Sequence, residues 1–188
     1  MALVRQDFLD DAERIGCEVE AVMAVAAVES SGSGFNPDGS VISLFEGHWF
    51  SKLTKGVYDK DYPTISYPKW TREFYGKNWQ GEQARLKLAL SLDRPAALMS
   101  ASYGVFQIMG LNHAYCGFPG PESFYTAMCK DENEQLAAFT SFIISKGLGD
   151  ELREKNWAGF AKQYNGPQYA ENRYDIKLAA AYARAKGQ

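Results

Sequence analysis

Glu29 occupies a position that favours a carboxyl group with an elevated pKa. It ends the apolar stretch of residues 18–29 and shares a helical face with Val22, Val25 and Ala26. Burial against these side chains and the negative end of the helix dipole both favour the neutral acid. Such an acid can donate a proton near neutral pH. The alternative is a structural glutamate that turns toward water or pairs with an arginine.

Three short motifs, far apart in the sequence, place polar groups beside glycine. They are Val28-Glu-Ser-Ser-Gly-Ser-Gly-Phe35, Ala101-Ser-Tyr-Gly-Val-Phe-Gln-Ile-Met109 and Gln163-Tyr-Asn-Gly-Pro-Gln-Tyr169. Glycine allows a ligand to approach the backbone closely. Gln107 stands among apolar residues and needs hydrogen-bond partners, so it either binds a ligand or ties its loop to the core. Asn165 follows a predicted helix, where asparagine is also a common cap.

Together the motifs resemble those of the goose-type lysozyme and soluble lytic transglycosylase superfamily, where equivalent segments line one saccharide groove. The matches are Glu29-Ser30, Gly104-Val-Phe-Gln-Ile-Met109 and Tyr164-Asn-Gly166. The pattern Val-Glu-Ser-x-Gly-x-Gly-Phe, followed by Phe-Glu-x-His-x-Phe, is similar to that of the phage-type N-acetylmuramidase (endolysin) family. It occupies residues 28–35 and 45–50. The resemblance spans about residues 20–185.

The resemblance implies that Glu29 is the catalytic acid of a muramidase. Such an enzyme cleaves the β-1,4 bond between N-acetylmuramic acid and N-acetylglucosamine in bacterial peptidoglycan, without a cofactor or a metal. A glycosidase usually needs a second carboxylate as base or nucleophile. Glu46 is the best candidate, and the alternative for it is a structural partner of His48 or of a backbone donor.

The remaining site residues are expected to bind the saccharide. These are Ser30, His48, Tyr103, Gln107, Tyr164 and Asn165. Flat aromatic side chains suit pyranose rings, and further candidates for such contacts are Trp49, Trp70, Trp79, Tyr67 and Tyr75. Most aromatic residues of any domain belong to its core, so we expect two or three contacts, with Tyr103 and Tyr164 preferred.

Two other functions are compatible with the same residues. A lytic transglycosylase would leave a 1,6-anhydro sugar without using water, and the acetamido group of the substrate would replace the second carboxylate. A non-catalytic wall-binding domain would use the aromatic groove alone. That second function gives the acid at Glu29 no purpose, so we rank it last.

Composition and charge limit the kinds of partner that the protein is expected to bind. A net charge of −3 and a pI near 5.5 argue against nucleic acid. The sequence has no run of about 18 apolar residues, which a membrane-spanning helix would need. The N-terminus lacks the apolar core of a signal peptide. We expect a monomer that is made in the bacterial host cytoplasm and reaches the cell wall after the membrane is breached.

Cys17, Cys116 and Cys129 fit three buried thiols better than a Cys116–Cys129 disulfide. Neither His48 nor His113 has metal-site spacing.

The elements that must position these residues are mostly helices. We expect a mainly α (α+β lysozyme-like) fold with one catalytic domain over residues 1–188 and a short strand or hairpin near residues 38–47 that flanks the groove. Helices are predicted over residues 5–15, 18–30, 47–54, 81–91, 95–99, 121–129, 132–146, 156–164 and 172–186. Residues 55–80 are predicted to be irregular, as functional surface loops often are.

Overall fold

Helices account for most of the computed structural model, which describes residues 3–30, 32–166 and 169–187. Ser31 of the first motif, and Pro167 and Gln168 of the third, lie outside the described residues. In chain order the elements are α1 (Asp7–Ile15), α2 (Val19–Glu29), β1 (Ser43–Phe45), α3 (Gly47–Leu53), α4 (Trp79–Leu92), α5 (Arg94–Met99), β2 (Ala101–Tyr103), β3 (Ile108–Met109), the 3₁₀ helix η1 (Gly110–Asn112), α6 (Pro121–Met128), α7 (Glu132–Lys146), α8 (Gly149–Glu154), α9 (Trp157–Tyr164) and α10 (Tyr174–Lys186). The predicted mainly helical fold with a small β region is confirmed.

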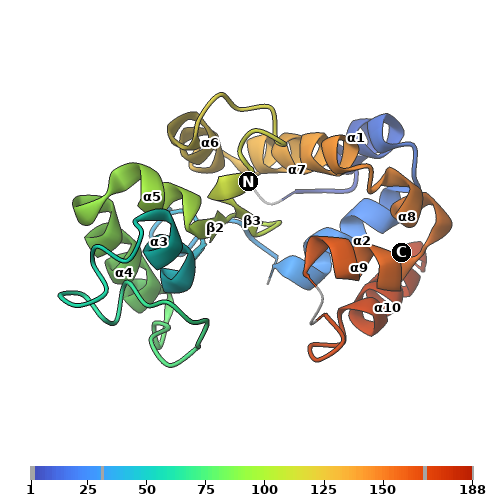
Figure 1. The fold of residues 1–188 in the computed structure, drawn as a ribbon. Helices are drawn as coiled ribbons and strands as arrows, with labels where there is room; N and C mark the ends of the chain where they lie inside the picture. Colours follow the sequence, from blue (N-terminus) through green and yellow to red (C-terminus); the bar gives the residue numbers. More distant parts are fainter. Residues whose placement is uncertain (1–2, 31, 167–168, 188) are drawn as a thin grey trace.

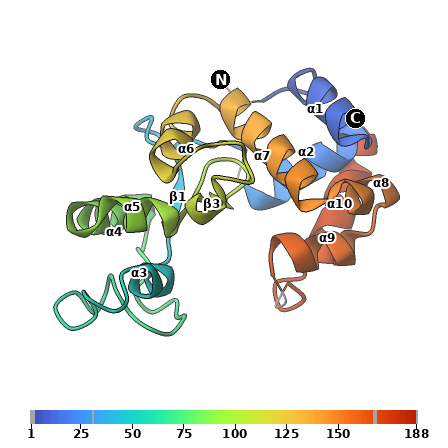
Figure 2. The same ribbon diagram turned by 45° about the horizontal axis from the view of Figure 1, so that its top comes forward.

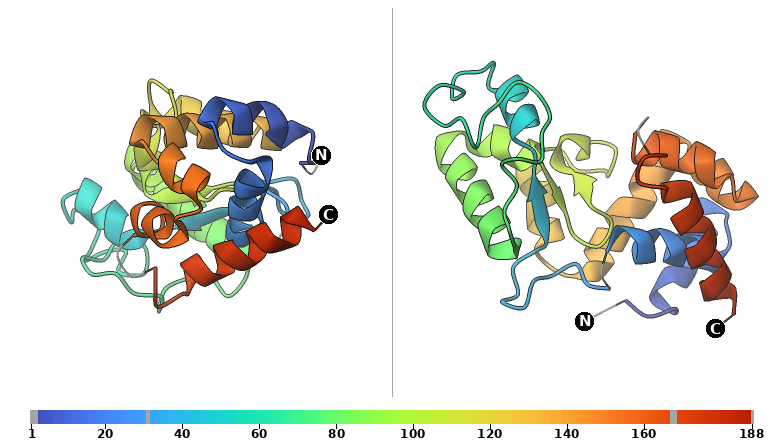
Figure 3. Two further views of the ribbon diagram at one scale, coloured as in Figure 1. Left: turned by 90° about the vertical axis from the view of Figure 1, so that its right-hand side faces the viewer. Right: turned by 90° about the horizontal axis from the view of Figure 1, so that it is seen from below.

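The helices form two groups on either side of the centre of the molecule (Figure 1). One group holds α3, α4 and α5 next to the sheet, and the other holds α1, α2, α8, α9 and α10. Helices α6 and α7 connect the two groups, because α6 packs on α5 and α7 packs on both α6 and α1. The same separation is visible after rotation (Figures 2 and 3). Helix α10 lies against α2 and therefore holds the C-terminal segment beside the helix that ends in Glu29.

A three-stranded antiparallel sheet in the order β1-β2-β3 joins the strand at residues 43–45 to the second motif. Leu44 pairs with Ser102, and Ser102 in turn pairs with Met109. The strand predicted near residues 38–47 is present as β1, with an isolated bridge between Phe35 and Val41 just before it. Strands β2 and β3 were not predicted, because three- and two-residue strands are too short to show an alternating pattern.

Capping residues that can be recognised in the sequence set several of the helix ends. The N-cap side chains of Asn78, Asp93, Asp131 and Asn156 accept backbone hydrogen bonds at the starts of α4, α5, α7 and α9. Gly16 and Gly147 end α1 and α7 in the left-handed conformation. Helix α8, which begins at Gly149, lies between the helices predicted over residues 132–146 and 156–164 and is not among the predicted helices.

The segment between α3 and α4 is irregular, as predicted, and contains turns and bends but no helix or strand. Its first part is held in place by side chains: the Tyr58 hydroxyl donates to Leu92 O over 2.8 Å, and the Ser51 hydroxyl donates to Asp59 Oδ2 over 3.0 Å.

The three cysteines are free thiols. Only Cys116 is buried, whereas Cys129 is exposed, so the expectation of three buried thiols is wrong. None of the helices in the described ranges is both long and apolar enough to cross a bilayer.

Candidate active site

A groove with a volume of about 470 Å³ lies between the two groups of helices. The residues that line it from the sheet side are Leu44, Glu46, Trp70, Arg72 and Tyr75, and those from the opposite side are Asn165, Asn172 and Tyr174. The first set belongs to β1, the N-cap of α3 and the irregular segment, and the second to the connection between α9 and α10 and to the first residue of α10. Both connections lie at the bottom of Figure 1. The groove thus gathers polar and aromatic side chains from segments about 100 residues apart in the chain.

Glu29 reaches this groove through Asn165, whose Nδ2 donates a hydrogen bond of 2.7 Å to Glu29 Oε1. The face of α2 that Glu29 shares with Val22 and Val25 is buried, as the sequence predicts. Burial raises the pKa of the Glu29 carboxyl to about 7, while the Asn165 hydrogen bond and the charge of Lys177 act in the opposite direction. Its partner is an uncharged amide rather than an arginine, so the geometry fits a proton donor better than a structural ion pair.

The end of α9 fixes the position of Asn165. Its backbone N–H donates to Ala161 O over 2.8 Å, as expected of a helix C-cap. The preceding Tyr164 stacks on Phe160 and donates its hydroxyl to Phe106 O over 2.7 Å. Tyr164 therefore braces α9 against the turn between β2 and β3 and does not line the groove. Its predicted contact with the saccharide has no support in this geometry, because its hydroxyl is already bonded to the protein.

Glu46 lines the sheet side of the groove and contacts two side chains. The Tyr75 hydroxyl donates to Glu46 Oε1 over 2.7 Å, and His48 Nδ1 lies 3.2 Å from Glu46 Oε2. Burial lowers the pKa of the His48 imidazole, with the nearby Glu46 carboxylate opposing that effect. His48 is then mostly neutral at pH 7. Glu46 therefore has His48 as a neighbour, as its structural alternative predicts, and it also lines the groove.

A buried ion pair supports this side of the groove. Arg85 Nη1 lies 3.0 Å from Glu82 Oε2, and it also donates to Phe45 O over 3.0 Å. Glu82 accepts hydrogen bonds from the backbone N–H groups of Phe45 and Gly76. The Arg85 guanidinium carbon lies 5.7 Å from the centre of the Tyr75 ring. These contacts hold the segment that carries Tyr75 against β1, which ends beside Glu46. Nothing in the sequence singles out this pair, because it has the spacing of an ordinary i,i+3 surface pair on a helix.

Helix α7 contacts the glycines of two motifs through Gln135, a buried residue. Gln135 Oε1 accepts a hydrogen bond from Val105 N over 2.8 Å, and Gln135 Nε2 donates to Met128 O over 2.8 Å. A Cβ atom at Gly34 would lie 2.1 Å from Gln135 Oε1, and one at Gly104 would lie 2.4 Å from Gln135 Cδ. Glycine at both positions is therefore required by the approach of Gln135. At these two positions the motif glycine is explained by packing against Gln135.

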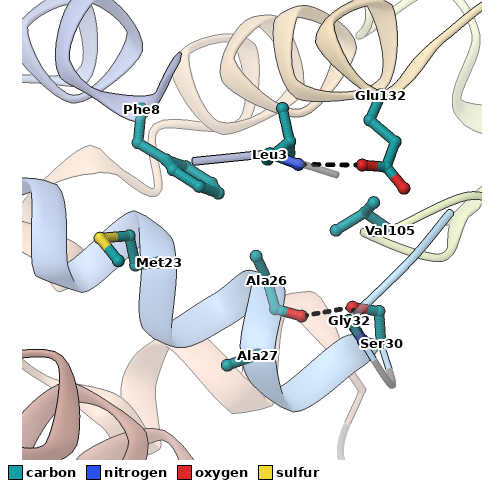
Figure 4. A pocket seen from close by; sticks show the side chains of 9 residues that line it. All are labelled: Leu3, Phe8, Met23, Ala26, Ala27, Ser30, Gly32, Val105 and Glu132. Carbon is teal, nitrogen blue, oxygen red and sulfur yellow. Dashed lines mark hydrogen bonds between the residues drawn. The ribbon is translucent and has the colours of Figure 1, made fainter. Parts of the chain in front are cut away.

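Figure 4 shows a second, mostly apolar pocket of about 160 Å³ on another side of α2. Ser30 lines this pocket, and its hydroxyl donates to Ala26 O over 2.9 Å. The carboxylate of Glu132 is already bonded, since it accepts hydrogen bonds from Leu3 N over 3.0 Å and from Gly34 N over 2.6 Å. This pocket offers no free acid or base for catalysis. Ser30 acts here as a helix cap, and its predicted contact with the saccharide has no support in this geometry.

Two further predicted contacts have a different place in the structure. Tyr103 is 1% exposed, and its hydroxyl donates to Leu98 O over 3.1 Å. The prediction that it touches the saccharide is wrong, because β2 is the central strand and turns this ring into the core. Gln107 closes the turn between β2 and β3 by donating to Gly104 O and accepting from the Ser102 hydroxyl, each over 2.9 Å. That arrangement fits the structural alternative for Gln107.

Of the candidate aromatic residues, Trp70 and Tyr75 line the groove. Tyr67 is 6% exposed and belongs to the interior. Arg72, Asn172 and Tyr174 line the groove without having been singled out from the sequence, which shows no motif around them. Within residues 3–30, 32–166 and 169–187, no three His, Cys, Asp or Glu side chains gather in a metal-binding arrangement.

Comparisons with known proteins identify a family and a solved structure that the chain resembles. The model of the N-acetylmuramidase family matches residues 18–186. Among solved structures, the crystal structure of Burkholderia AP3 phage endolysin is 37% identical to the chain and superimposes with a TM-score of 0.88. The match covers 100% of this chain and 73% of that one. No curated protein matches the chain.

Proposed function

The chain belongs to the N-acetylmuramidase family of peptidoglycan-degrading enzymes, and on that premise we propose that it cleaves the β-1,4 bond between N-acetylmuramic acid and N-acetylglucosamine. Glu29 is the general acid and Glu46 the general base of this reaction. The likeness to a phage endolysin supports a role in the lysis of a bacterial host.

The contact between Glu29 and Asn165 at the groove carries the proposal. A carboxyl group with a pKa of about 7 is largely protonated in slightly acidic solution and about half protonated at pH 7, so it can protonate the leaving glycosidic oxygen. After proton transfer, Glu29 becomes a carboxylate. The Asn165 amide then donates to a charged acceptor, which strengthens the 2.7 Å hydrogen bond. Lys177 stabilises the same charge at longer range.

Glu46 is suited to activate water on the sheet side of the groove. Its Oε1 is held by the Tyr75 hydroxyl, which orients the carboxylate without neutralising it. A neutral His48 likewise leaves the negative charge on Glu46. The two carboxylates come from opposite groups of helices, as required when an acid and a base act on a bond that lies between them.

Digestion of purified peptidoglycan in water enriched in oxygen-18 tests the reaction type and the bond. We expect fragments that end in reducing N-acetylmuramic acid and carry one oxygen-18 atom at the anomeric position, as detected by mass spectrometry. Unlabelled 1,6-anhydro ends would instead identify a lytic transglycosylase. Reducing N-acetylglucosamine ends would contradict the assigned bond. Binding to peptidoglycan without any soluble fragment would leave only a wall-binding role.

A further inference from the structure

Arg72 is the one cationic residue among those that line the groove. Its side chain is exposed. In the part of the chain that the structure describes, no ion pair involves Arg72. An unpaired guanidinium in a binding groove is available to an anionic group of a ligand, and its planar fork suits a carboxylate in particular.

The neighbourhood of Arg72 directs its charge into the groove. Its guanidinium carbon lies 5.6 Å from the centre of the Trp70 ring, which is 54% exposed. Burial and the charge of Glu29 raise the pKa of the Tyr174 hydroxyl, while the charge of Arg72 acts against them. Arg72 therefore influences a residue on the opposite wall. A sugar ring placed on Trp70 would lie next to this cation.

The substrate carries the complementary group. Muramyl residues bear a lactyl carboxyl, which is free in bare glycan and linked to a peptide stem in the intact wall, and the stem has carboxylates of its own. A neutral polymer of N-acetylglucosamine has none of these. The protein as a whole carries a net charge of −3, so its overall charge does not attract an anionic polymer. Local charge complementarity at the groove must supply that attraction.

We propose that Arg72 determines specificity by pairing with a carboxylate of the muramyl residue or of its peptide stem while Trp70 supports the sugar ring. The inference rests on the proposed function, since it assumes that the glycan occupies this groove. It also explains why an exposed arginine and an exposed tryptophan stand together in an irregular segment that leads to Tyr75.

The test compares kcat/KM at low salt on native peptidoglycan and on peptidoglycan whose carboxylates are converted to methylamides with methylamine and a carbodiimide. The variants are Arg72→Gln, Arg72→Lys and the matched control Lys69→Gln, which removes an exposed cation from the same segment outside the groove. We expect the wild type and Lys69→Gln to prefer the native substrate by about fivefold, the upper range for an exposed ion pair. Arg72→Lys should keep part of this preference, and Arg72→Gln should have none.

The proposal would be overturned if Arg72→Gln kept the full preference for the native substrate. It would also be overturned if this variant lost kcat/KM equally on native and methylamidated peptidoglycan. The preference should also shrink at about 1 M salt, where the screening length falls to about 3 Å. Native peptidoglycan presents the carboxylates of its stems, because its lactyl groups are amide-linked, so the preference measured there reports the stem. Peptidoglycan stripped of its stems by an amidase presents free lactyl carboxylates instead, so a wild-type preference for it over its methylamidated form that is lost in Arg72→Gln reports the lactyl group. If the wild type releases no muramyl fragments from native substrate, the proposed function itself fails.

Discussion

Asn165 Nδ2 donates a hydrogen bond of 2.7 Å to Glu29 Oε1, although 136 positions separate the two residues in the chain. Burial disfavours the charged form of Glu29, whereas the amide and the more distant Lys177 favour it. The opposing effects leave the pKa of Glu29 at about 7. An acid in that range holds its proton until it is needed and can still release it, as general acid catalysis requires.

The pH dependence of activity should report this balance. We expect kcat/KM on peptidoglycan to fall on the alkaline side with an apparent pKa near 7, as Glu29 loses its proton. Asn165→Ala removes a donor that stabilises the carboxylate, so it should move this alkaline limb to higher pH while lowering the maximum rate. Asn133→Ala, an exposed substitution on α7, serves as the control. An alkaline limb at the same pH in all three proteins would contradict the role of Asn165.

The same pKa should appear in the stability of the protein. The folded-state pKa of Glu29 is about 7, against about 4.3 in the unfolded chain. Between these values the folded state binds more protons, so the free energy of unfolding falls as the pH rises from about 4 to 7. Glu29→Gln removes this loss and should gain roughly 3 kcal/mol on the wild type between pH 4 and 8. Urea unfolding at pH 4 and at pH 8 measures this gain. Parallel pH profiles of stability for the wild type and Glu29→Gln would exclude the raised pKa of Glu29.

Glu46→Gln tests the second carboxylate. Loss of a general base should lower kcat by about 100-fold or more with little change in the melting temperature. Tyr75→Phe should produce a smaller loss in kcat, because it removes only the 2.7 Å hydrogen bond that orients Glu46. Tyr58→Phe is the matched control, since that hydroxyl bonds to Leu92 O away from the groove. If Glu46→Gln kept the wild-type kcat, Glu46 would not be the general base and Glu29 would be the only catalytic carboxyl group.

Glycine at position 104 should be required because of Gln135. Gly104 has a φ of +72°, and an added Cβ would lie 2.4 Å from Gln135 Cδ. Gly39 has a similar φ of +84° with nothing within 4 Å of such a Cβ, so it isolates the backbone effect. We expect Gly39→Ala to cost about 1 kcal/mol and Gly104→Ala about 3 kcal/mol, because steric overlap adds to the strain. Equal costs in urea unfolding would show that the contact with Gln135 is unimportant.

Local signals in the sequence were sufficient for most helices and for the buried setting and raised pKa of Glu29. Helix ends follow capping residues such as Asp131 and Gly147, and Glu29 stood out because an acid at the end of an apolar helix is unusual. Tyr103 was misassigned because its place in the central strand depends on pairing with β1, which lies more than 50 residues earlier. Arg72 was missed because an irregular segment has no periodicity from which to infer which side chain faces a ligand.

The most direct test of the account is the release of reducing N-acetylmuramic acid ends from purified peptidoglycan by Glu29→Gln at pH 6. Glutamine keeps the size of the side chain but cannot donate the proton. We expect a folded variant, with wild-type circular dichroism, that still binds peptidoglycan and releases fragments at least about 1000-fold more slowly than the wild type. Release at the wild-type rate by the folded variant would contradict the assignment of Glu29 as the proton donor.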